Sequence, residues 1–179
     1  PVKSSLVSGK TIVVFEDLYH NNVKISTHSD ISDENQSVHY PDVKTSAIDK
    51  DTKDDVGTVH KNAVIVDTVQ LTNLVPGKNY TVNGTLHDQK SGDVFKDADG
   101  NAVTQKAEIT VSADGKNITA KNGEKVTVTK TGTAVSGTVD LTFTFDSSLL
   151  AGKTLVAFED LEHNGVKVAT HSNIYDESQ

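Results

Sequence analysis

Two segments of the sequence carry a histidine, several acids and a glutamine at the same spacing. They are THSDISDENQ (residues 27–36) and THSNIYDESQ (residues 170–179). Histidine can transfer protons near neutral pH, and histidine together with acids can also bind a metal ion. The first segment lacks the glycine and terminal glutamate of an EF-hand calcium loop, and His163 and His171 match no familiar zinc spacing. We therefore expect no metal and no cofactor here.

The repetition extends beyond these ten residues. Residues 9–36 align without gaps to residues 152–179 and match at 19 of 28 positions. The copies lie 143 residues apart, the size of one domain. The simplest interpretation is a tandem array, with the tail of one domain at 1–36 followed by a whole domain at 37–179.

Each copy has the pattern of a β-hairpin. TLVAFEDL predicts a strand, HNG a tight turn and VKVAT the returning strand. Between the copies, further short strands are separated by polar turns, and alternation in VDLTFTF places Val139, Leu141, Phe143 and Phe145 on one face. The fold class predicted is all-β: an immunoglobulin-like antiparallel β-sandwich, with a partial hairpin from a preceding repeat at the N-terminus.

Composition excludes several classes of function. The net charge of −8 argues against binding to nucleic acid or to an anionic membrane. No stretch approaches the roughly 20 apolar residues of a membrane span. With no signal peptide, we expect either a cytosolic protein or an excised piece of an exported one. The absence of cysteine excludes disulfides. An exported domain with this thin core would therefore need another kind of cross-link.

The chain also resembles a known family. VAFEDL (residues 156–161), followed by the hairpin and HSNIYDESQ, is similar to the VaFE repeat, the Thr–Gln ester-bond domain of Gram-positive surface adhesins. Residues 66–86 resemble the family's second strand and its turn, and VKTSAID (residues 43–49) its first strand. The resemblance covers 42–179 as one full repeat and 1–36 as the last hairpin of the repeat before it.

The resemblance implies a covalent ester that forms without an external enzyme. Carried onto this sequence, it joins Thr45 on the first strand to Gln179. Gln36 is then the acceptor of the preceding repeat. This is a single turnover on the chain itself, so the domain is not expected to be an enzyme.

The same resemblance implies three assisting residues: His171, Asp67 on the second strand, and a further acid. We place that acid at Glu159, with Asp146 as a rival. The residue types suit acyl transfer, because histidine can take the proton of the threonine hydroxyl. Two acids buried together cannot both ionise, so one can donate a hydrogen bond to the oxyanion.

Geometry adds one condition. In a straight strand, eight residues would separate His171 from Gln179 by roughly 26 Å. Because SNIYDES is rich in turn-forming residues, we expect a bend that brings the two ends closer.

The resemblance implies a stalk module of an adhesin, extracellular and attached to the cell wall as part of a larger protein. Its partners would be neighbouring repeats in a tandem array and, through other domains, a host surface, with no nucleic acid or membrane. One alternative is a ligand-binding module for host matrix or glycan. Another is a Lys–Asn isopeptide domain, with Lys44 near the same place on the first strand.

The partial hairpin at 1–36 lacks its own sheet. We expect it to pack against a neighbouring molecule or to replace the matching hairpin of another copy, in which case Gln36 would bond Thr45 of a different chain.

Overall fold

A computed structural model of the chain describes residues 6–178. Short β-branched stretches between polar turns give thirteen strands and one 3-10 turn in this range. In chain order they are β1 (Thr11–Val13), β2 (Glu16–His20), β3 (Val23–His28), η2 (Glu34–Gln36), β4 (Ser37–His39), β5 (Asp42–Asp49), β6 (Ala63–Leu74), β7 (Asn79–Asp88), β8 (Thr104–Val111), β9 (Ile118–Lys121), β10 (Glu124–Lys130), β11 (Val135–Phe145), β12 (Leu155–His163) and β13 (Val166–His171).

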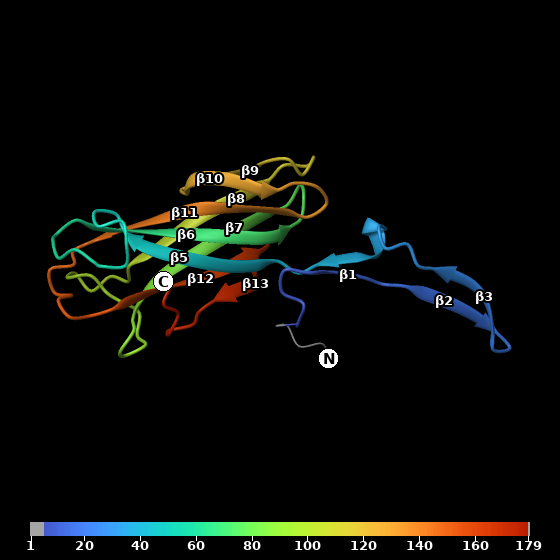
Figure 1. Ribbon diagram of the computed structural model, residues 1–179, viewed down its shortest axis with the longest axis horizontal. Coiled ribbons are helices and arrows are strands. Elements are labelled where there is room, and N and C mark those ends of the chain that lie inside the picture. Colours follow the sequence, from blue (N-terminus) through green and yellow to red (C-terminus); the bar gives the residue numbers. More distant parts are fainter. Residues whose placement is uncertain (1–5, 179) are drawn as a thin grey trace.

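Strands β5 to β13 form the body of the molecule as two packed antiparallel sheets (Figure 1). The four-stranded sheet has the order β10-β11-β6-β5, and the five-stranded sheet has the order β13-β12-β7-β8-β9. This confirms the predicted all-β, immunoglobulin-like sandwich. No helix in residues 6–178 is long and apolar enough to cross a membrane.

The core follows the predicted alternation. Val139, Leu141 and Phe143 on β11 are fully buried, and Phe145 nearly so, because successive side chains of a strand point to opposite faces. Gly84 on β7 sits opposite them, where an added Cβ would lie 2.8 Å from the Leu141 side chain. The two sheets therefore pack closely at this point, which leaves room only for glycine.

Both predicted hairpins are present with the predicted turns. Asn164 and Gly165 join β12 to β13, and both have positive φ, at 52° and 75°. Asn21 and Asn22 do the same between β2 and β3, at 47° and 65°. Two-residue hairpin loops favour asparagine and glycine, because such turns require left-handed backbone that suits the twist of the strands.

The first copy forms an arm, residues 6–40, that projects away from the body (Figure 1). Here the copied strand is not continuous as β12 is, but breaks between β1 and β2. β12 lies between β7 and β13, whereas β2 forms a two-stranded sheet with β3, and β1 pairs with β4 instead. The two copies are closely similar in sequence, so the continuous strand of the second copy depends on a neighbour like β7.

A buried asparagine ties the arm to the body. The side-chain amide of Asn73, at the end of β6, donates to the backbone oxygens of Lys10 (2.8 Å) and Tyr40 (3.1 Å). The hydroxyl of Ser8 also donates to Asp42 at the start of β5, at 2.6 Å. These bonds hold the base of the arm against the four-stranded sheet.

Equivalent leucines in the two copies give a paired test of this difference. Leu161 on β12 is fully buried, but its counterpart Leu18 on β2 is 59% exposed. We expect Leu161→Ala to lower the free energy of unfolding of the body by about 2–5 kcal/mol. Leu18→Ala should change it by no more than about 0.5 kcal/mol. Urea unfolding of both variants measures this, and equal losses would contradict the account.

Candidate functional site

The first strand of the body and its last hairpin meet at one edge of the sandwich. β5 is the edge strand of the four-stranded sheet and β13 that of the five-stranded sheet. β5 lies close to both β12 and β13. Side chains on the inner face of β5 therefore face residues at the end of the chain.

Thr45 points into this edge. It pairs in register with Val69 on β6 and is only 7% exposed, while its neighbours Lys44 and Ser46 face outward. A threonine in a strand is more often a strand former than a nucleophile. Its inward orientation places the hydroxyl among the groups described next.

Two acids lie buried beside it. Asp67 on β6 is fully buried, and Glu159 on β12, in the opposite sheet, is 1% exposed. Each occupies an inward position that an alternating strand normally fills with an apolar residue. Buried acids are rare unless they are paired, so this pair stands out from the surrounding core.

Burial raises the pKa of Asp67, and the nearby side chains of Glu159, Thr45 and His171 act to lower it. Neither Asp67 oxygen has a partner at full hydrogen-bond geometry within residues 6–178. The contacts are nonetheless close enough for the four side chains to influence one another. Two carboxyl groups this close in a dry site favour a single shared proton.

The structure brings Glu159 to the site and leaves Asp146 outside it. Asp146 follows β11 and accepts a hydrogen bond from the backbone N–H of Ser148 at 2.9 Å. A hydrogen bond from the Ser148 hydroxyl is the main reason that the pKa of Asp146 is lowered, and this backbone bond adds to it. Asp146 therefore caps a turn as an ionised group, while Glu159 faces Asp67 across the core.

His171 is the last residue of β13 and pairs in register with Glu159. Its side chain is half-buried, and its Nε2 lies 2.8 Å from an oxygen of Asp176. Sequence reasoning did not single out Asp176. A signal was present, because the repeat has Asp33 at the corresponding position, five residues after His28.

The bend predicted after His171 is confirmed. The backbone N–H of Asp176 donates to the oxygen of Asn173 at 3.0 Å, which closes a turn. The chain then returns to β5, where the N–H of Ala47 donates to the oxygen of Ser178 at 3.0 Å. Gln179 lies outside the described residues. Its neighbour Ser178 is hydrogen-bonded to Ala47, which lies two residues from Thr45 along β5.

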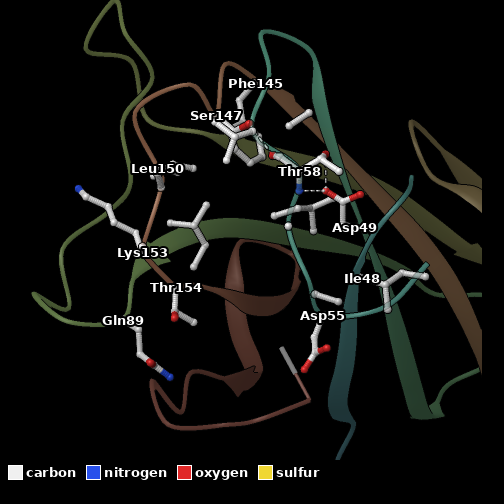
Figure 2. A pocket seen from close by; sticks show the side chains of 18 of the residues that line it. Ile48, Asp49, Asp55, Thr58, Gln89, Phe145, Ser147, Leu150, Lys153 and Thr154 are labelled. Carbon is white, nitrogen blue, oxygen red and sulfur yellow. Dashed lines mark hydrogen bonds between the residues drawn. The ribbon is translucent and has the colours of Figure 1, made fainter. Parts of the chain in front are cut away.

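A pocket of about 670 Å³ opens beside this edge (Figure 2). Its lining includes Ala47 and Asp176. Asp49 lies in its wall and accepts hydrogen bonds from the N–H and hydroxyl of Thr58, both at 2.9 Å. Burial acts to raise the pKa of Asp49, but these bonds, with one from Asp51, outweigh it and lower the pKa. The Asp49 carboxylate therefore stabilises the loop that forms the pocket wall.

The first copy keeps part of the same arrangement. His28 Nε2 lies 2.9 Å from an oxygen of Asp33, as in the second copy. Glu16, the counterpart of Glu159, is exposed on β2. Among residues 6–178, no group of three or more histidines and acids is placed to hold a metal ion.

Comparison with known proteins identifies the family. A family model described as "T-Q ester bond containing domain" matches residues 1–40 and again residues 41–179. The two matches divide the chain four residues after the boundary expected from the repeat. No curated protein matches the chain.

Two solved structures have a similar fold. Both are of a bacterial adhesin from Mobiluncus mulieris that contains intramolecular disulfide, isopeptide and ester bond cross-links, in two crystal forms. The TM-scores are 0.55 and 0.50, at 21% and 20% identity. In each case the match covers 78% of this chain and 55% of the adhesin chain, so this chain spans about half of the protein it matches.

Proposed function

Because the chain belongs to the family of T-Q ester bond containing domains, we propose that its body is a stalk module of a surface adhesin. An ester between Thr45 and Gln179 joins its first strand to its last segment. The observation that carries the proposal is the hydrogen bond from Ala47 N–H to Ser178 O. It holds the residue next to Gln179 against the strand that bears Thr45.

The reaction needs no second reactant. Oγ1 of Thr45 attacks the side-chain carbonyl carbon of Gln179, and a carbon–oxygen bond forms as the carbon–nitrogen bond breaks. His171 takes the hydroxyl proton and returns it to the departing nitrogen, which leaves as ammonia. The protonated member of the Asp67–Glu159 pair donates a hydrogen bond to the oxyanion between these steps. One turnover consumes both side chains, so the domain modifies itself and does not act as an enzyme.

The bond serves a mechanical purpose. In the sequence, Thr45 and Gln179 are close to the first and last residues of the body, so force applied between those ends would pass through the ester. The strand pairs of both sheets would then carry none of the load. This cross-link replaces the disulfide that a cysteine-free domain cannot form.

Neighbouring repeats are the partners that this function requires. The arm repeats the sequence of β12 and β13, and in the body those strands pack against β7 and β5. We assign the arm as the last hairpin of a preceding repeat, whose sheets would cover side chains such as Leu18 and Ile25. Such an array belongs outside the cell, attached to the cell wall as part of a larger protein.

Single-molecule pulling between the two ends of the chain tests the stalk function. The unaltered protein should release none of the chain length between residues 45 and 179 as force rises, because the ester bypasses the fold. Thr45→Ala should release that length in one unfolding step. Release of the same length by the unaltered protein would contradict the proposal.

A further inference from the structure

One carboxylate organises the bend between His171 and Gln179. Oδ2 of Asp176 lies 2.8 Å from His171 Nε2. Oδ1 accepts hydrogen bonds from the N–H and the hydroxyl of Ser178, at 3.0 Å and 2.6 Å. Ser178 in turn accepts from Ala47 on β5. Asp176 therefore connects the histidine to the residue that precedes Gln179.

The first copy forms the same bend by itself. Asp33 there binds His28 Nε2 at 2.9 Å and accepts from Asn35 N–H, two residues on, also at 2.9 Å. The backbone N–H of Asp33 donates a hydrogen bond to the oxygen of Asp30, three residues earlier, at 3.2 Å. The N–H of Asp176 makes the equivalent bond to the oxygen of Asn173. The bend is thus present both in the exposed arm and against β5 in the body.

Two such different surroundings show that the local sequence encodes the bend. Aspartate side chains commonly accept from backbone N–H groups two residues on, which stabilises a turn without help from distant residues. The Asp176 carboxylate is also held in its ionised form. Hydrogen bonds from Ser178 are the main reason that its pKa is lowered, His171 adds to them, and burial opposes them.

The contact with His171 selects a tautomer. An ionised carboxylate only accepts hydrogen bonds, so Nε2 of His171 must carry the hydrogen that is shared with Asp176. In the neutral ring this leaves the lone pair on Nδ1. A histidine base needs one nitrogen with a lone pair and a fixed ring orientation, and a carboxylate on the other nitrogen supplies both.

From these contacts we propose that Asp176 is a positioning residue for formation of the Thr45–Gln179 ester. It fixes His171 in the tautomer with Nδ1 as the base, and it folds the last segment so that Ser178, the residue before Gln179, is held on the strand that bears Thr45. This inference rests on the proposed function. Asp176 itself contacts neither reacting group through its described bonds.

The rate of ester formation tests the proposal, with a matched control in the same chain. Loss of ammonia is followed by intact mass after cell-free synthesis of the whole chain. Asp176→Asn should slow it at least about tenfold. Asp33→Asn makes the same chemical change in the arm, away from Thr45, and should leave the rate unchanged. Equal rates for Asp176→Asn and the unaltered chain, or equal slowing by both variants, would overturn the proposal.

The tautomer of His171 gives a second test, because it would not change if Asp176 had only a structural role. ¹⁵N NMR of the imidazole is recorded in Thr45→Ala, which cannot react, with and without Asp176→Asn. We expect His171 to carry its hydrogen on Nε2 and to lose this preference in the double variant. A hydrogen on Nδ1 in the single variant would overturn the proposal. If the unaltered chain loses no ammonia at all, the proposed function fails, and the tautomer still decides whether Asp176 orients His171.

Discussion

Replacing Thr45 with alanine is expected to lower the free energy of unfolding of the body by about 5 kcal/mol. The cross-link would close nearly the whole body into one loop, and a loop of this size strongly restricts the unfolded chain. The loss of one hydroxyl from a site that is 7% exposed would by itself cost only about 1–3 kcal/mol. The larger figure therefore depends on the covalent bond.

Chemical denaturation of both proteins, followed by circular dichroism, measures the difference. Ser46→Ala is the matched control, because Ser46 is the next residue on β5 and faces outward. It should change stability by no more than about 0.5 kcal/mol. A loss of no more than about 3 kcal/mol for Thr45→Ala, the cost of the hydroxyl alone, would indicate that no cross-link contributes to the stability of the unaltered protein.

Replacing Glu159 with glutamine is expected to slow ester formation by at least about 100-fold. Glutamine has nearly the same shape, so the packing between β6 and β12 is retained. It cannot share a proton with Asp67, however, so the pair no longer supplies a protonated carboxyl group to the oxyanion. Intact mass over time after synthesis measures the rate as the fraction of chains that have lost one ammonia.

Glu16→Gln is the control for this variant. Glu16 occupies the same position in the first copy but is exposed on β2, so its replacement should leave the rate unchanged. Asp67→Asn should slow the reaction as Glu159→Gln does, because either change breaks the pair. Ester formation at the normal rate in either acid variant would show that the pair has no part in the reaction.

Much of the fold could be predicted from local sequence. The alternation of Val139, Leu141, Phe143 and Phe145 gave the buried face of β11. The HNG sequence of the second hairpin predicted a tight turn, and the turn is present with two left-handed residues. Both signals depend on backbone geometry alone, which is why they could be read without knowledge of the packing.

The assignment of the second acid depended on packing between sheets. Glu159 and Asp146 were alternatives in the sequence, because β6 gives no sign of which strand faces Asp67. Only the fold places β12 opposite that residue and puts Asp146 in a turn with Ser148. A buried acid within an apolar strand indicates a functional site. The acid can be recognised as buried only when the packing of its strand is known.

Two further features needed the structure. Asp176 stood among several acids of the repeated segment, and its bond to His171 distinguishes it. The break between β1 and β2 in the arm has no signal in the sequence, since the matching residues form one strand, β12, in the body. Closely similar local sequence adopts different structures when a neighbouring strand is present or absent.

The most direct test of the central claim is mass spectrometry of the protease-digested protein. If the ester forms, the peptide that contains Thr45 and the peptide that contains Gln179 will be found joined, with a mass one ammonia below their sum. Thr45→Ala should yield the same two peptides separately. Separate peptides of full mass from the unaltered protein would contradict the account.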